Sequence, residues 1–229
     1  MTALTDDRRL AATLRRNALA VLPAPLIAGA ALAALAWPPL GVPALLGAAG
    51  WLLALAARQP VALLVARRTT PARGAAIIGW CSGPAEELVR LALVLLALRS
   101  FEDAIWAGFG WATIEVLLVL SNGFAMAALI AKDDAKSLEA RALLEAQGLL
   151  APHHAGWGLL ERLSATALHT GFTLLLLAQP WLVLLTLPAH SAINMLMVRI
   201  GRTRLAVAEI AFAIVSAAVL AAGILLATA

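Results

Sequence analysis

Residues 83–98 read GPAEELVRLALVLLAL, an apolar stretch that is interrupted by two adjacent glutamates and one arginine. These charged residues are Glu86, Glu87 and Arg90. A charged side chain at the centre of a bilayer costs at least about 2.5–3.5 kcal/mol. Ionisable residues within an apolar span of this kind are therefore candidates for a functional site.

The composition of the whole chain indicates a membrane protein. Of the 229 residues, 62% are hydrophobic and 13% are charged, and the mean hydropathy is +0.91. A soluble domain is usually about 25% charged. The net charge of +4 comes from basic residues in predicted loops, so it does not indicate a nucleic-acid partner. The single cysteine, Cys81, excludes an intrachain disulfide and a cysteine-rich metal site.

The apolar runs predict an all-α, polytopic membrane protein, a bundle of about seven transmembrane helices in a single domain over residues 1–229. Pro60 is expected to interrupt the second span, and Ser82, Gly83 and Pro84 can break the third just before the glutamates. The predicted spans are residues 18–37, 40–57, 74–98, 103–129, 158–178, 180–198 and 205–228.

A polar linker at about 131–156 separates the fourth predicted span from the fifth. Its apolar residues recur at helical spacing, which predicts an amphipathic helix on the cytoplasmic membrane surface. They are Leu138, Ala142, Leu143, Ala146 and Leu149. His153 and His154 follow in the linker, where we expect them to be solvated.

The basic residues of the loops predict the topology. Loops on one predicted side of the membrane hold nearly all of them, and the opposite loops hold only Arg99. The positive-inside rule then places the N-terminus in the cytoplasm and the C-terminus outside the cell membrane. Only an odd number of spans gives this result, which favours seven over six or eight. The basic residues on the cytoplasmic side are Arg8, Arg9, Arg15, Arg16, Arg58, Arg67, Arg68, Arg73, Lys132, Lys136, Arg141, Arg199, Arg202 and Arg204.

Four ionisable side chains are predicted at one depth, in four successive spans. Glu87, Glu115, His169 and His190 each lie about 15–20 Å from the start of a predicted helix, near the middle of a hydrocarbon core of about 30 Å. Polar groups inside a bilayer must satisfy one another, because no water is available to them. We therefore expect a shared polar site in the interior of the bundle.

The spacings within the helices suggest catalytic roles. Glu86 and Glu87 point about 100° apart, so one carboxylate can pair with Arg90 while the other faces the site. The sequence does not decide which glutamate does which. Asn194 lies one turn after His190 and can orient the imidazole or donate a hydrogen bond to an oxyanion.

A carboxylate with two imidazoles is a ligand set for a divalent metal, most simply zinc, with one position left for water. Glu115, His169 and His190 are the candidate ligands. A second carboxylate can then act as the general base that takes the proton of the water.

Each of these groups also has a structural interpretation. A histidine can join two helices by a hydrogen bond, and the Glu–Arg pair can be a structural ion pair. Three functions remain open: a metal-dependent intramembrane peptidase, a proton- or ion-coupled transporter, and a catalytically silent membrane scaffold. Glu and His chains also form proton relays in transporters, but the sequence shows no inverted repeat of the kind that many transporters contain.

The order of four motifs resembles a known superfamily. EE-x-x-R, G-F-G-x4-E, ER-x6-H and H-x3-N follow one another within residues 79–198, inside a core of 74–198. This order is similar to that of the intramembrane proteases that include the CAAX-processing (CPBP/Abi), PrsW and YhfC families, with YhfC the nearest. YhfC-like sequences usually carry a histidine in the stretch that here holds Trp111 and Thr113.

The resemblance implies an intramembrane metalloprotease that acts on a membrane protein or a lipidated peptide. Glu86 and Glu87 would activate water. His169 and His190 would bind a metal or stabilise the tetrahedral intermediate.

Overall fold

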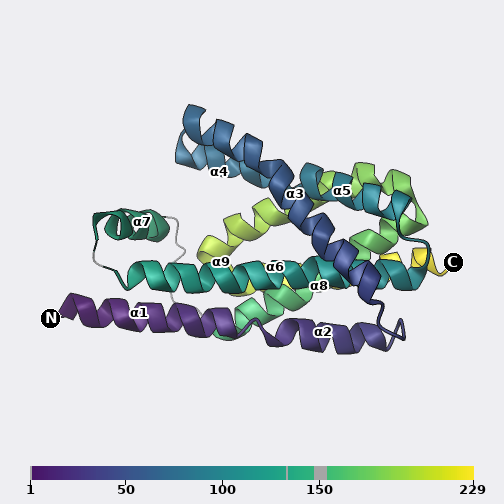
Figure 1. Cartoon of the computed structure of the whole chain (residues 1–229), viewed down its shortest axis with the longest axis horizontal. Helices are drawn as coiled ribbons and strands as arrows, with labels where there is room; N and C mark the ends of the chain where they lie inside the picture. The colour runs from purple at the N-terminus through teal and green to yellow at the C-terminus, as the bar shows by residue number, and fades with distance from the viewer. Residues whose placement is uncertain (1, 133, 147–153) are drawn as a thin grey trace.

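The structure, a computed structural model, describes residues 2–132, 134–146 and 154–229, which are helical and contain no strand (Figure 1). The all-α prediction is confirmed. The helices are α1 (Thr2–Leu19), α2 (Pro23–Ala33), α3 (Gly41–Arg68), α4 (Pro71–Trp80), α5 (Ser82–Leu96), α6 (Phe101–Ile130), α7 (Ala135–Ala146), α8 (Ala155–Ala178), the short 3-10 helix η1 (Pro180–Leu182) and α9 (Val183–Ala227).

Several of these helical stretches are long and apolar enough to cross a membrane. Within the described residues they are Asp7–Ala33, Gly41–Arg68, Phe101–Ile130 and Pro180–Ala227. The predicted first span, 18–37, is not a single helix. The end of α1, a turn at residues 20–22 and α2 occupy this part of the chain. Pro23 opens α2, because a proline at the first helical position removes no hydrogen bond that the helix needs. The number of seven spans stays a prediction.

The two predicted helix breaks have different outcomes. Pro60 does not interrupt α3, which continues to Arg68, so the predicted end at residue 57 is wrong. A proline removes a single backbone hydrogen bond, and membrane helices tolerate this loss. The break before the glutamates is present, since α4 ends at Trp80 and α5 begins at Ser82. The predicted span 74–98 is therefore two helices.

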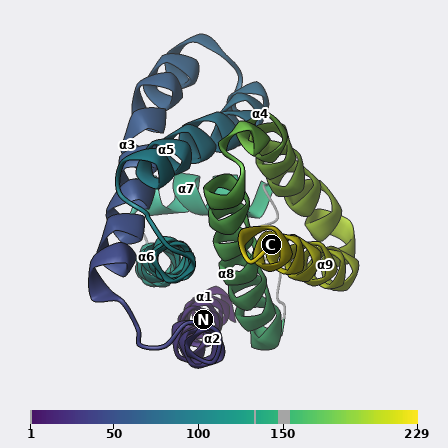
Figure 2. The same cartoon turned by 90° about the vertical axis from the view of Figure 1, so that its right-hand side faces the viewer.

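The predicted sixth and seventh spans form the two arms of α9. The backbone of Arg204 is non-helical, with φ −141° and ψ 61°. His190, before this kink, lies 5.8 Å from Phe172 between ring centroids, and the backbone of Leu220, after it, packs against Gly171. A straight helix would place His190 and Leu220 about 45 Å apart. The chain therefore folds back at the kink, and both arms pack on α8 (Figures 1 and 2).

The linker contains a helix, α7, and the position of this helix on a membrane surface stays a prediction. An ion pair between Arg141 and Asp7 joins it to α1. Leu138 and Ala142 are exposed, so this side of α7 is free to contact a membrane surface. Leu149 and His153 lie outside the described residues, while His154 caps α8 by accepting a hydrogen bond from the Gly156 backbone nitrogen at 3.1 Å.

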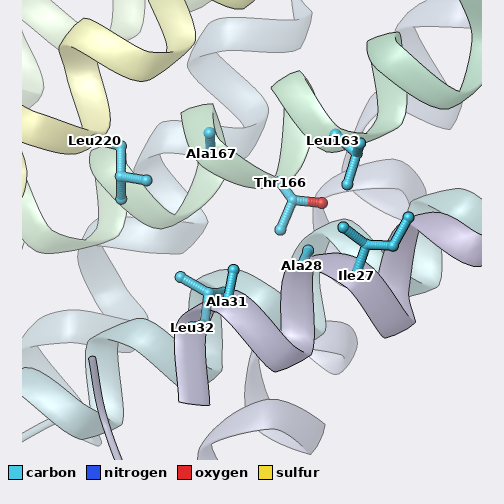
Figure 3. Close-up of a pocket in the computed structure, with 8 residues that line it drawn as sticks. All are labelled: Ile27, Ala28, Ala31, Leu32, Leu163, Thr166, Ala167 and Leu220. Carbon is cyan, nitrogen blue, oxygen red and sulfur yellow. The ribbon is translucent and has the colours of Figure 1, made fainter. Parts of the chain in front are cut away.

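An apolar groove lies between α2, α8 and α9 (Figure 3). Its one polar lining residue is Thr166, whose hydroxyl donates to the backbone carbonyl of Arg162 in its own helix at 2.8 Å. The groove therefore presents an apolar surface. The other lining residues are Ile27, Ala28, Ala31, Leu32, Leu163, Ala167 and Leu220.

Helices α3 and α6 approach each other backbone to backbone. A Cβ added at Gly47 would overlap the carbonyl oxygen of Ala107, and one added at Gly110 would overlap that of Ala44. Small residues at matching positions on two helices allow this contact, as in other membrane bundles. The pairing fixes α6, and with it Trp111 and Glu115, against α3.

We expect Gly47→Ala and Gly110→Ala each to lower the free energy of unfolding by about 1–3 kcal/mol, because the added methyl groups overpack a rigid contact. Thermal unfolding in detergent micelles measures the effect. Gly41→Ala is the matched control, because a Cβ at Gly41 meets nothing within 4 Å. Equal melting temperatures for all three variants would contradict the close α3–α6 contact.

Candidate functional site

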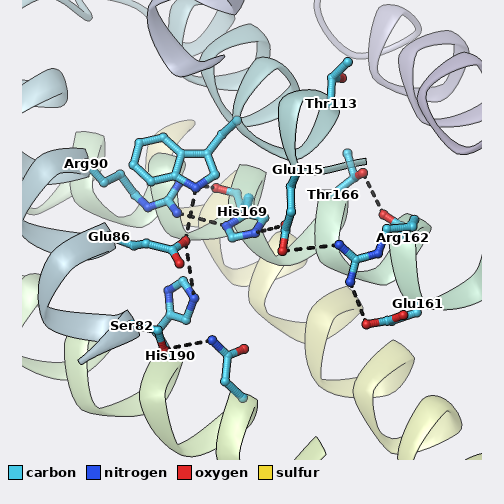
Figure 4. A network of polar contacts seen from close by, with 12 residues as sticks. Ser82, Glu86, Arg90, Thr113, Glu115, Glu161, Arg162, Thr166, His169 and His190 are labelled. Carbon is cyan, nitrogen blue, oxygen red and sulfur yellow. Dashed lines mark hydrogen bonds and ion pairs between the residues drawn. The ribbon is translucent and has the colours of Figure 1, made fainter. Parts of the chain in front are cut away.

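Four helices bring the predicted polar residues together inside the bundle (Figure 4). Helix α5 supplies Glu86, Glu87 and Arg90, and α6, α8 and α9 supply one ionisable group each. The side chains of Glu87 and Arg90 are fully buried. The groups from the other three helices are Glu115, His169 and His190, of which Glu115 is the most exposed, at 25% of its side chain.

Arg90 lies at the centre of the cluster. Its Nε donates to Glu87 Oε1 at 3.2 Å, and one terminal nitrogen donates to Thr173 Oγ1 at 2.9 Å and to the backbone carbonyl of His169 at 3.1 Å. The other terminal nitrogen lies 3.0 Å from His169 Nδ1. The guanidinium also lies over the ring of Trp111, 4.2 Å from its centroid, a cation–π contact. These contacts compensate the burial of a positive charge, and Glu87 is the glutamate that holds Arg90.

The neighbours of the two histidines assign their tautomers. An arginine nitrogen only donates, so His169 Nδ1 accepts from Arg90 and Nε2–H donates to Glu115 Oε2 at 3.1 Å. His190 Nδ1 donates to Glu87 Oε1 at 2.7 Å. In the neutral ring, the Nε2 of His190 is then an acceptor, and it faces Glu86 Oε2 at 3.6 Å. A carboxylate behind an imidazole in this way fixes both its orientation and its tautomer.

Glu86 is held more loosely than Glu87. Trp111 Nε1 donates to Glu86 Oε2 at 3.3 Å, and Arg58 lies 3.6 Å from Oε1. The 3.6 Å between Glu86 Oε2 and His190 Nε2 is too long for a direct hydrogen bond, and both atoms are acceptors when the ring is neutral. A water beside this pair can donate one hydrogen to each.

Glu115 has a charged partner outside the predicted set. Arg162 Nη1 lies 3.2 Å from Glu115 Oε1, and Arg162 Nη2 lies 2.6 Å from Glu161 Oε1. Both ring nitrogens of His169 are bonded, to Arg90 and to Glu115. Among the described residues, no group of three or more His, Cys, Asp or Glu side chains is placed to hold a metal ion. The predicted ligand set does not fit a metal in this arrangement, and zinc stays a prediction for metal analysis to test.

Asn194 contacts the α4–α5 break and not the ring of His190. Its amide donates to Ser82 Oγ at 3.0 Å, and Ser82 in turn donates to the Gly79 carbonyl at 2.8 Å. Ser191 also bonds to both sides of the α4–α5 break. Its hydroxyl donates to the Trp80 carbonyl at 2.8 Å and accepts from the Gly83 nitrogen at 3.1 Å. Asn194 therefore positions α5, which carries the two glutamates.

The chain has no match among protein-family models, curated proteins or solved structures. Membership of the YhfC-like superfamily therefore stays an expectation from the four motifs.

Several contact residues of the cluster were not predicted from the sequence. The sequence predicts Arg58 in the loop after the span 40–57, but α3 continues through this position and places the Arg58 side chain 3.6 Å from Glu86. Trp111 lies in the stretch where the resemblance predicts a histidine, and its indole N–H donates a hydrogen bond to Glu86. Arg162 could have been found, because it forms part of the motif ER-x6-H. Ser191 and Thr173 carry no comparable signal, since polar residues of this kind are common in membrane helices.

Proposed function

We propose that the protein is an intramembrane hydrolase that cleaves a membrane-embedded or lipidated peptide. The observation that supports it is the position of His190 between two buried carboxylates. Its Nδ1 is bonded to Glu87 and its Nε2 faces Glu86. A carboxylate–imidazole pair with a free acceptor nitrogen is an arrangement for general-base catalysis.

The proposed reaction uses a water that lies beside Glu86 and His190. Glu86 accepts one hydrogen bond and orients the water, and His190 Nε2 takes its proton as the hydroxide oxygen attacks the peptide carbonyl carbon. Glu87 stabilises the imidazolium that results. Collapse of the tetrahedral intermediate breaks the C–N bond, and His190 returns the proton to the leaving amine. The sequence assigned water activation to a glutamate, whereas this geometry favours His190 with a glutamate on each side.

A second candidate is a catalytically silent scaffold, which the burial of the cluster favours. Glu87 and Arg90 are fully buried and His190 is 2% exposed, as in a packed structural network. A proton-coupled transporter fits less well. The rings of His169 and His190 lie 5.6 Å apart between centroids, but the hydrogen bonds that connect Glu87 to His169 pass through Arg90, and a guanidinium does not release its proton in proteins.

The test is cleavage in a bilayer by the purified full chain. The protein is reconstituted with a set of single-span peptides, some of them lipidated, in water enriched in ¹⁸O. We expect product carboxylates that carry one ¹⁸O with the wild type and none with the Glu86→Gln/Glu87→Gln variant. A folded wild-type protein that cleaves no peptide would overturn the hydrolase and favour the scaffold. Metal analysis of the same preparation tests the zinc prediction.

A further inference from the structure

The end of α3 and α4 form a hairpin whose tip projects from the rest of the bundle (Figure 1). Val65 is buried where it packs on Gly74, and a Cβ at Gly74 would lie 3.1 Å from its side chain. Near the base of the hairpin, Gly79 contacts Met195 of α9. The hairpin is therefore a defined structure with an exposed outer surface.

The tip of the hairpin carries an uncompensated positive charge. Arg67, Arg68 and Arg73 are exposed, and none of them forms an ion pair with an acidic residue in the part of the chain that the structure describes. The sequence from Arg8 to Ala85 contains no Asp or Glu. The helix dipole accounts for arginines at the end of α3, but it disfavours a cation in the first turn of α4, where Arg73 lies.

A groove on the outer face of α3 leads to this charge. It is lined by Pro60, Leu63, Leu64 and Arg67, which share one face of the helix at spacings of three and four residues. Leu63 and Leu64 are 62% and 50% exposed. The groove is thus apolar along its length and cationic at its end, and the residues that line it span about 10 Å.

We propose that the α3–α4 hairpin binds an anionic phospholipid. One acyl chain lies along Pro60, Leu63 and Leu64, and the phosphate lies at Arg67, with Arg68 and Arg73 close by. Basic residues beside a membrane-spanning helix attract anionic headgroups in this way. The site is separate from the polar cluster and does not depend on the proposed hydrolase activity.

The test is lipid retention by the full-length protein in detergent micelles, measured by native mass spectrometry with phosphatidylglycerol and phosphatidylcholine of matched chains. We expect the wild-type protein to retain more phosphatidylglycerol than phosphatidylcholine. Each arginine near the headgroup contributes a factor of about five in affinity. Arg67→Gln should therefore weaken retention about fivefold, and Arg67→Gln/Arg68→Gln/Arg73→Gln by on the order of 100-fold.

The matched control is Arg8→Gln/Arg9→Gln/Arg16→Gln, which removes the same charge from exposed positions on α1. It should retain the lipid like the wild type, and unchanged melting temperatures show that both triple variants are folded. Equal loss in both triple variants, or no preference in the wild type, would overturn the proposal. Glycerol phosphate should compete poorly because it lacks an acyl chain, and full competition would reduce the site to a phosphate site without a lipid groove.

Discussion

Replacing Glu87 by glutamine is expected to lower the rate of peptide cleavage by about 10⁴-fold. In the wild type, the Glu87 carboxylate accepts the Nδ1–H of His190 at 2.7 Å. A glutamine amide can donate to Nδ1 instead, which moves the ring proton to Nε2, the atom that must receive the proton of the water. Single-turnover cleavage in bilayers measures the loss.

Glu86→Gln is the matched control, since it changes the neighbouring residue in the same way. Glu86 makes no direct hydrogen bond to His190, so its loss removes the orientation of the water but keeps the tautomer of the base. A smaller loss, about 10²-fold, is expected. If Glu87→Gln retains its rate while Glu86→Gln loses it entirely, the water is activated by Glu86 and the assignment of His190 as base is wrong.

Replacing Arg90 by methionine is expected to lower the free energy of unfolding by about 3–5 kcal/mol. The loss leaves Glu87 as a buried charge without its cation, and it also removes the donors to His169 and Thr173. It further removes the cation that lies over Trp111. Reversible unfolding in mixed micelles gives the value.

Two further variants separate the effect of the unpaired Glu87 charge from the effect of removing an arginine side chain. Arg90→Met/Glu87→Gln should recover part of the stability, because no unpaired charge then remains in the interior. Arg99→Met removes an exposed arginine that donates to backbone carbonyls at the end of α5, and should cost about 1 kcal/mol or less. If Arg90→Met and Arg99→Met lower the free energy of unfolding equally, the buried contacts of Arg90 do not stabilise the fold.

The all-α fold and the meeting of the polar groups follow from the sequence because both depend on position along a helix. Apolar runs give the helices, and a rise of 1.5 Å per residue gives the common depth of Glu87, Glu115, His169 and His190. The choice of partners does not follow in this way. Glu86 and Glu87 differ by about 100° around α5, and only the packing of α3, α8 and α9 decides which of them meets Arg90.

The errors have similar causes. Pro60 lies beside basic residues, a composition typical of a loop. Helix α3 nevertheless continues through Pro60 with one backbone hydrogen bond fewer, and Arg58 is therefore part of the bundle. Asn194 shares a helical face with His190, yet its amide donates to the hydroxyl of Ser82, the first residue of α5. Spacing within one helix cannot reveal a partner that another helix supplies.

The hydrogen bonds from Ser191 and Asn194 to the α4–α5 break have a consequence for the proposed function. The arm of α9 that carries these residues carries His190, and the helix that they hold carries both glutamates. The proposed base and the two carboxylates that flank it therefore lie on two elements that are bonded to each other, α5 and the first arm of α9. Under the proposed function, a peptide that enters between α5 and α8 would break the hydrogen bonds of Arg90 to His169 and Thr173, whereas the contacts of α5 with α9 would keep the glutamates beside His190.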